Sequence, residues 1–307
     1  MSLITAIICT HNRASYLAAA IDSLLHQDMD DYDVIVVDNG STDNTADVVK
    51  ERLDNPRLTY IYEPKLGLSV ARNTGAMNTD AQILAYLDDD AEASVSWLKN
   101  LVQVYQNDSQ VAIAGGSVNL ILPEGYDQLP EWISEDLAGA LGLYNLGEEI
   151  KYITEAGLTP RGLNYSIRRQ FLMDIGGFDI NLGRVGTKLL SNEELYMTEL
   201  ALKKGYKVAY IPDAKVGHNV QPERLKKDWF LRRSWWQGIS EYYRAQGKKT
   251  NKSQQFLNTA ERILRGIYKS FKYYGNPAVR FENLLYVYGQ FGYLKHLISG
   301  GELETRE

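Results

Sequence analysis

Apolar runs alternate with amphipathic stretches through the first half of the chain. The apolar runs have the length of buried strands and cover Leu3–Cys9, Asp33–Val37, Leu58–Tyr62, Gln82–Leu87 and Val111–Val118. The stretches between them have a helical spacing of apolar positions and lie around Leu17–His26, Asn44–Leu53, Ser69–Asn78 and Val95–Gln106. This alternation predicts right-handed βαβ units, and hence an α/β fold with a Rossmann-like, mainly parallel sheet.

The pattern changes twice further along the chain. After Val118 it becomes irregular, and ordered elements return with a predicted helix at Glu193–Lys204 and a strand at Lys207–Ile211. From about Glu223 the sequence is basic, rich in Tyr and Trp, and compatible with helices. We therefore expect a catalytic domain over residues 1–222, with halves at about 1–118 and 119–222, and a helical extension over 223–307.

Composition indicates an ordinary globular protein that works in a reducing compartment. The 307 residues are 44% hydrophobic and 23% charged, which is typical of soluble domains. The single Cys9 rules out an internal disulfide, and its apolar run favours a buried structural thiol over a nucleophile. We see no signal peptide and no apolar stretch of about 18 residues, so we expect a cytoplasmic protein.

Positive charge is concentrated near the C-terminus. Between Arg224 and Arg280 there are 14 Lys and Arg against 3 Asp and Glu, a surplus of 11, although the whole chain has a net charge of -6. This asymmetry favours a local anionic partner over nucleic acid. Peripheral contact of residues 223–280 with an anionic membrane is one interpretation. The alternative is that the rings pack on the catalytic domain while the charges face water.

Polar clusters follow three of the predicted strands. They are Thr10-His11-Asn12-Arg13, Asp38-Asn39-Gly40-Ser41-Thr42-Asp43 and Asp88-Asp89-Asp90. Ligands of open α/β sheets bind beyond the carboxyl ends of the strands. We therefore expect these clusters to form one site.

The acidic triplet predicts a cation site. Three adjacent carboxylates repel one another unless a cation or hydrogen-bond donors neutralise them. Mg²⁺ suits such oxygen ligands and is usually held by one or two carboxylates together with substrate phosphates. The alternative is a helix N-terminus, where acidic residues also gather.

Asp38 ends an apolar strand at the edge of the expected site. Its carboxylate can accept a hydrogen bond from a uracil-like imide or from a ribose hydroxyl. Gly40 permits a tight turn, and the polar residues Ser41 to Asp43 can cap the next helix, which is sufficient reason for their presence.

Five motifs in order resemble glycosyltransferase family 2. They are ICTHNR, VVDNGSTDNT, GLSVARNTGA, LAYLDDDA and GGFD, and the resemblance covers about residues 3–220. It implies the GT-A fold and inverting transfer of a sugar from a nucleotide-diphosphate donor.

The resemblance also implies roles for individual residues. Donor-binding positions are Thr10, Asn12, Arg13, Asp38, Arg72, Asp88 and Asp89. Asp90 would coordinate Mg²⁺ or Mn²⁺, with His218 close to the metal or diphosphate. Without the resemblance, Arg72 would be a solvated helical arginine and His218 a structural histidine.

Glu194 matches the catalytic base, and the neighbouring Glu193 is the second candidate. Displacement at the anomeric carbon needs a carboxylate within hydrogen-bond reach of the acceptor hydroxyl. The alternative is that both residues only favour a helix N-terminus. Expected acceptor-binding residues are Asn164, Arg232, Arg233 and Trp236. A plain turn at Asn164 and an amphipathic helix around Trp236 explain these residues equally well.

The expected reaction uses a UDP-sugar, or in second place a dTDP-sugar, and a saccharide or lipid-linked saccharide acceptor. Polysaccharide biosynthesis is the expected process, with addition of single sugars because the Gln-x-x-Arg-Trp signature of processive synthases is missing. The rivals are a nucleotidyltransferase, which would usually carry a Gly-rich basic phosphate loop near its N-terminus, and an inactive nucleotide-sugar-binding module. A dehydrogenase is excluded because no Gly-x-Gly-x-x-Gly follows the first strand.

Overall fold

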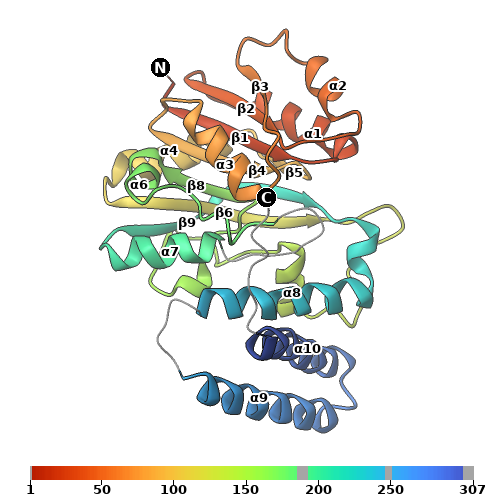
Figure 1. Cartoon of the computed structure of the whole chain (residues 1–307). Coiled ribbons are helices and arrows are strands. Elements are labelled where there is room, and N and C mark those ends of the chain that lie inside the picture. Colours follow the sequence, from red (N-terminus) through yellow and green to blue (C-terminus); the bar gives the residue numbers. More distant parts are fainter. Residues whose placement is uncertain (1, 185–192, 246–250, 300–307) are drawn as a thin grey trace. The chain divides into compact units, whose positions relative to one another are not determined.

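The computed structural model describes residues 2–184, 193–245 and 251–299. They fall into two compact units. The first unit comprises Met1–Ile121, Gly142–Ile180 and Glu193–Val220, and the second comprises Leu122–Leu141, Asn181–Asn192 and Gln221–Glu307. Figure 1 shows the elements of each.

A nine-stranded sheet forms the centre of the first unit, with strand order β3-β2-β1-β4-β8-β6-β9-β5 and β7 paired to β9. The strands are β1 Ile4–Thr10, β2 Tyr32–Asp38, β3 Leu58–Tyr62, β4 Ile83–Asp88, β5 Ala91–Ala93, β6 Val111–Ile121, β7 Lys151–Ile153, β8 Asn164–Arg168 and β9 Lys207–Asn219. Each predicted strand is present, and the predicted Lys207–Ile211 strand extends to Asn219.

The sheet is mainly parallel, as expected, with a minority of antiparallel strands. The strands β1 to β4 are parallel, as their βα connections require. The strands β6 and β9 pair in parallel and run in the same direction as β1 to β4. However, β8 runs antiparallel to both of its neighbours, and β5 and β7 run antiparallel to β9. The reason is that β8 follows the long irregular stretch after β6 and not a crossover helix, so the chain can enter the sheet in the opposite direction.

Helices pack against this sheet through apolar faces. They are α1 Ala14–Leu25, α2 Thr45–Lys50, α3 Leu68–Met77, α4 Trp97–Asn107, α6 Arg169–Asp174 and α7 Glu193–Lys203, with a short 3₁₀ turn at Ala156–Leu158. In α4, for example, Trp97, Leu98, Leu101 and Tyr105 are buried at helical spacing. The strands β1, β2, β4 and β8 are buried along nearly their whole length, whereas β3 and β7 are mostly exposed or half-buried. Burial raises the pKa of Cys9 on β1 to about 12, as expected of a structural thiol.

Three long helices form most of the second unit: α8 Lys227–Ala245, α9 Lys252–Lys272 and α10 Pro277–Ser299. The middle helix is α10, which packs against α8 on one side and α9 on the other (Figure 1). A Cβ at Gly238 of α8 would meet the Gly289 carbonyl oxygen of α10 at 1.8 Å. These two helices therefore approach each other at glycine.

The second unit also takes residues 122–141, which the sequence pattern placed in the acceptor half of the catalytic domain. This segment carries α5 Glu135–Ala138 and a 3₁₀ turn at Gly139–Leu141, and a further 3₁₀ turn at Pro222–Leu225 leads into α8. The Trp132 ring lies edge-on to Phe230 of α8 and Phe281 of α10. Ser134 donates a hydrogen bond to Glu282. Aromatic packing thus joins this loop to the helices.

Candidate functional site

Three neighbouring strands bring the predicted donor-binding residues together. β1 ends at Thr10, β2 at Asp38 and β4 at Asp88. In the sheet register Thr10 lies opposite Asp38, and Cys9 lies opposite Asp88. The polar clusters therefore meet at one sheet edge, as parallel strands predict.

Asn12 connects the first two clusters. Its side-chain oxygen accepts hydrogen bonds from the Thr42 and Asp43 backbone amides, at 2.8 and 3.3 Å. Its own amide donates to the Ser41 hydroxyl at 2.9 Å. Asn12 adopts a φ of 54°, a left-handed conformation that asparagine tolerates better than most residues. In this structure its side chain holds the loops after β1 and β2 together.

Asp38 is buried, and two groups hold its carboxylate. The Ser41 amide donates to Oδ1 at 2.9 Å, and the Tyr60 hydroxyl on β3 donates to Oδ2 at 2.7 Å. Sequence reasoning missed Tyr60. The available signal was its position in the strand next to β2, two residues before the residue paired with Asp38.

Asp89 and Asp90 of the acidic triplet are buried, and Asp90 lies beside a histidine and an arginine. Asp90 Oδ1 lies 3.3 Å from His218 Nε2, and Asp90 Oδ2 lies 3.4 Å from Arg13 Nη1. Pairing of β5 with β9 brings His218 there, because it lies opposite Ala91. Burial first, and then the neighbouring Asp90 charge, raise the pKa of Asp89 to about 7.

The chemistry of this cluster fits a divalent cation. Asp89 and Asp90 are crowded carboxylates in a buried site, and an added cation would relieve their repulsion. Carboxylate oxygens are ligands that suit Mg²⁺ and Mn²⁺, and the imidazole of His218 lies beside Asp90 as a further nitrogen donor. Among the residues that the structure describes, no three His, Cys, Asp or Glu side chains are arranged to hold a metal by themselves. A metal at Asp90 would therefore need ligands from the substrate, such as diphosphate oxygens.

Arg72 on α3 holds the two candidate bases. Its Nη1 lies 2.8 Å from Glu194 Oε1 and 3.3 Å from Glu193 Oε1, both at the start of α7. Its Nη2 lies 4.0 Å from Asp88 Oδ1. Arg72 is only 2% exposed. Burial by itself lowers the pKa of Arg72, but the charges of Glu194, Glu193 and Asp88 outweigh this and raise it. Arg72 is thus a buried cation that links the acid pair to the triplet.

Gly162 leaves room for this arrangement. A Cβ built there would lie 1.8 Å from Glu194 Oε1 and 2.6 Å from Arg72 Nη2. The Gly162 carbonyl oxygen also accepts a hydrogen bond from Arg72 Nη2 at 3.3 Å. Glycine is needed at this position because of the close approach of the ion pair.

Asn73, next to Arg72, fixes the Gly-Gly-Phe-Asp turn. It donates to the Phe178 carbonyl at 2.9 Å and accepts from the Phe178 amide at 2.8 Å. Gly177 has a φ of 89°, and the nearest atom to a Cβ built there would be Asn73 Oδ1 at 2.8 Å. The Arg72 guanidinium lies 5.4 Å from the Phe178 ring centroid. This ring therefore forms one wall beside the buried cation.

The predicted acceptor residues are divided between the two units. Asn164 has no exposed surface. It accepts a hydrogen bond from the Trp97 indole at 2.9 Å and donates to the Ser117 and Ala214 carbonyls at 3.0 and 2.8 Å. In this structure its side chain bridges strands inside the first unit. Arg232, Arg233 and Trp236 lie on α8 in the second unit.

Residues 5–154 match the family model described as Glycosyl transferase family 2. This match assigns residues 5–154 to the family. A glucosyl-dolichyl phosphate glucuronosyltransferase of Haloferax volcanii is 26% identical over 77% of this chain and 75% of the relative. A validoxylamine A glucosyltransferase of Streptomyces hygroscopicus subsp. jinggangensis is 33% identical over 37% of this chain and 28% of the relative.

Solved glycosyltransferase structures share the fold of this chain. The mannosyltransferase PcManGT from Pyrobaculum calidifontis, in complex with GDP-Man and Mn²⁺, matches with a TM-score of 0.57 and 18% identity, over 98% of this chain and 76% of that one. GalNAc-T7 with UDP, GalNAc and Mn²⁺ matches with a TM-score of 0.57 and 17% identity, over 82% and 52%. The expected GT-A fold and the expected helical C-terminal region are both confirmed.

Proposed function

We propose that this glycosyltransferase is an inverting, metal-dependent enzyme whose catalytic base is Glu194. The observation that carries the proposal is the Arg72 link, which places Glu193 and Glu194 next to Asp88 at the sheet edge. A base and a donor-binding cluster then lie within one region of one unit. Glu194 is the more exposed acid of the pair, with 16% of its side chain accessible against 4% for Glu193. It is therefore better able to meet an acceptor.

The proposed step is a direct displacement at the anomeric carbon. The acceptor oxygen forms a bond to this carbon, and the bond to the phosphate oxygen breaks with its electron pair on the diphosphate. Glu194 accepts the proton of the acceptor hydroxyl. Asp90, together with His218 and the substrate phosphates, would hold a Mg²⁺ or Mn²⁺ ion, which would supply charge neutralisation for the departing diphosphate. Solved neighbours that contain Mn²⁺ support this cofactor.

The proposed donor is a UDP-sugar, with a dTDP-sugar second. Asp38 supports this choice because a carboxylate accepts the imide N–H that uracil and thymine share. Its two oxygens each accept one hydrogen bond from the protein, and each has capacity for another. Thr10, Arg13 and Asp89 would contact the rest of the nucleotide diphosphate.

The proposed acceptor is a saccharide hydroxyl, free or on a lipid carrier, in polysaccharide biosynthesis. The name of the Haloferax volcanii relative, which specifies a glucosyl-dolichyl phosphate, supports a lipid-linked acceptor.

A donor screen tests the proposal. Release of nucleoside diphosphate would be measured for a panel of UDP-, dTDP- and GDP-sugars with Mn²⁺. An enzyme-free sample gives the spontaneous hydrolysis, and Glu194→Gln tests the assigned base. We expect release from UDP-sugars to be fastest and to depend on Glu194. Release by Glu194→Gln at the wild-type rate would show that Glu194 is not the catalytic base. A preference for GDP-sugars would show that Asp38 does not recognise a uracil or thymine nucleobase.

A further inference from the structure

Helix α9 carries an apolar stripe that faces away from its helical neighbour. Leu257, Leu264, Tyr268 and Phe271 are 62%, 69%, 66% and 73% exposed. Their spacing of seven, four and three residues places them on one face of the helix. The buried residues of α9 are Thr259, Ile263, Gly266 and Ser270, and a Cβ at Gly266 would meet Val287 of α10 at 2.5 Å. The contact with α10 thus uses a different face.

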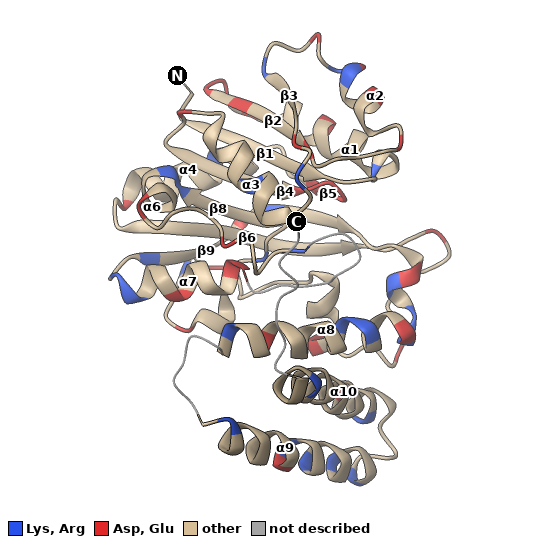
Figure 2. Ribbon diagram, in the orientation of Figure 1, with Lys and Arg blue, Asp and Glu red and all other residues tan. Residues whose placement is uncertain are grey.

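Basic side chains run along the polar face of the same helix. Arg262, Arg265, Lys269 and Lys272 are all exposed, and with Lys252 they make five cations against the single acid Glu261 (Figure 2). An exposed apolar stripe beside a basic face is typical of helices that lie in the interface of an anionic membrane. No helix among the described residues is long and apolar enough to cross a bilayer.

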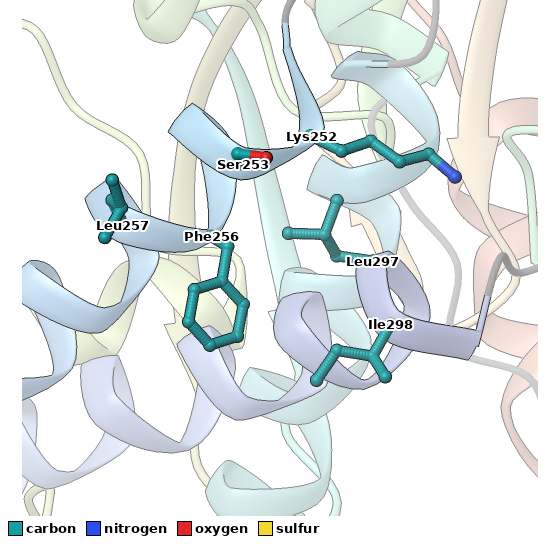
Figure 3. Close-up of a pocket in the computed structure, with 6 residues that line it drawn as sticks. All are labelled: Lys252, Ser253, Phe256, Leu257, Leu297 and Ile298. Carbon is teal, nitrogen blue, oxygen red and sulfur yellow. The ribbon is translucent and has the colours of Figure 1, made fainter.

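An apolar pocket continues the stripe at the N-terminal end of α9. It has a volume of about 420 Å³ and lies between α9 and the end of α10 (Figure 3). Its lining residues are Lys252, Ser253, Phe256, Leu257, Leu297 and Ile298. Leu257 belongs to both the stripe and the pocket, so the two form one continuous apolar surface. A pocket of this lining suits an acyl chain, with the Lys252 ammonium available to a phosphate headgroup.

The aromatic residues of α8 differ from those of α9. The Trp229 ring packs edge-on to Phe230, Trp235 lies 5.5 Å from Tyr288 between ring centroids, and Tyr242 packs against Tyr293. These rings serve the packing of the second unit. The basic, aromatic-rich region of the sequence therefore has two parts, and the exposed apolar stripe lies on α9.

We infer that the outer face of α9, together with its pocket, docks the protein on the surface of an anionic phospholipid bilayer. Charge complementarity favours an anionic bilayer over a second copy of the chain as the partner of this face. In a two-fold symmetric dimer the same basic face would meet itself, and its cations would repel. A bilayer offers acyl chains to the stripe and phosphates to the cations. The purpose that we assign to docking rests on the proposed function: docking would bring the enzyme to a lipid-linked acceptor at the bilayer surface.

Vesicle sedimentation of the full-length protein tests the inference. The vesicles would be phosphatidylcholine alone and an equimolar mixture of phosphatidylcholine and phosphatidylglycerol. We expect binding to the mixed vesicles only, with strong weakening in 1 M salt, where the screening length falls to about 3 Å. Leu264→Ser/Phe271→Ser should reduce binding at least about tenfold. Lys269→Gln/Lys272→Gln should reduce it about fivefold for each charge removed.

Matched variants on the first unit control for general changes in surface character. Met77→Ser/Val95→Ser removes exposed apolar side chains, and Lys203→Gln/Lys204→Gln removes exposed charges. Both should bind vesicles as the wild type does. Equal losses in these variants, or protein that stays in the supernatant with mixed vesicles at low salt, would overturn the inference. A concentration-dependent dimer without vesicle binding would assign the face to a second copy.

The two proposals can fail separately. Sedimentation needs no turnover, so docking can be present in a protein that transfers no sugar. Conversely, the rate of sugar transfer to a water-soluble acceptor, measured as nucleoside diphosphate release, should be the same in Leu264→Ser/Phe271→Ser and in the wild type. Loss of vesicle binding with full soluble turnover is the result expected for this variant.

Discussion

Arg72 Nη1 lies 2.8 Å from Glu194 Oε1, and both side chains are largely withdrawn from water. Removing these charges from water is unfavourable, so the pair is stable only when its geometry and surrounding hydrogen bonds are good. Here Glu193, Asp88 and the Gly162 carbonyl surround the same guanidinium. Arg72 therefore orients the carboxylate that we propose as the base, and it connects this carboxylate to the donor-binding strand β4.

Replacement of Glu194 tests the base. Glu194→Gln keeps the shape of the side chain and removes its capacity to accept a proton. We expect the rate to fall by about 10²–10⁴-fold while nucleotide affinity changes little. Turnover and nucleotide binding would be measured in parallel. The same loss in Glu193→Gln, with Glu194→Gln near wild type, would transfer the role to the neighbouring residue.

Replacement of Arg72 should cost both stability and turnover. Arg72→Met leaves its carboxylate partners without their buried cation, which we expect to lower the free energy of unfolding by about 3–5 kcal/mol. Urea unfolding measures this. Arg52→Met is the matched control, because Arg52 pairs with the half-exposed Asp22, and such pairs contribute about 0–1 kcal/mol. Similar losses in the two variants would contradict a special role for Arg72.

Gly162→Ala tests the geometry of the site alone, because it would displace charged side chains without removing any charge. The added methyl group would overlap Glu194 Oε1 and displace the Arg72 pair. We expect turnover to fall at least about tenfold, since small displacements of reacting groups are costly. Gly157→Ala is the control, because no atom lies within 4 Å of a Cβ built there. Unchanged kinetics in Gly162→Ala would show that the pair can shift without loss.

Metal dependence is tested at Asp90. Asp90→Ala should abolish EDTA-sensitive turnover and weaken binding of nucleoside diphosphate in the presence of Mn²⁺, because Asp90 would help to hold a metal that neutralises the charge of the diphosphate. Calorimetric titration of UDP with and without Mn²⁺ gives the second readout. Full wild-type activity in excess EDTA is the outcome that excludes a metal.

Asp89 should make the metal-free protein less stable as the pH rises. Its pKa is raised from 3.8 to about 7, so around pH 5–6 the folded protein holds a proton that the unfolded chain releases. The stability that this protonation provides is present at low pH and is lost as the pH rises through about 7. In EDTA, Asp89→Asn should therefore raise Tm at pH 8 and have a smaller effect at pH 5. A pH-independent difference would contradict the raised pKa.

The sequence predicted the fold and the strand-end clusters well because both depend on local patterns. Apolar runs located β1 to β4, and the ends of these strands located Thr10, Asp38 and Asp88. The direction of β8 had no comparable signal, because strand direction depends on the path of an irregular connection. The contacts of Arg72 were also hidden, since Glu193 and Glu194 lie far away in sequence. Likewise, the composition of residues 223–280 gave no means of separating the inward rings of α8 from the outward rings of α9.

The raised pKa of Cys9 has a practical consequence for spectroscopy. The chain contains one cysteine, and near neutral pH it has almost none of the thiolate that reacts with maleimides. The natural protein should therefore react only slowly with maleimides at this half-buried thiol. A cysteine introduced at an exposed position would carry a fluorophore or spin label as the dominant reporter, without prior removal of native thiols.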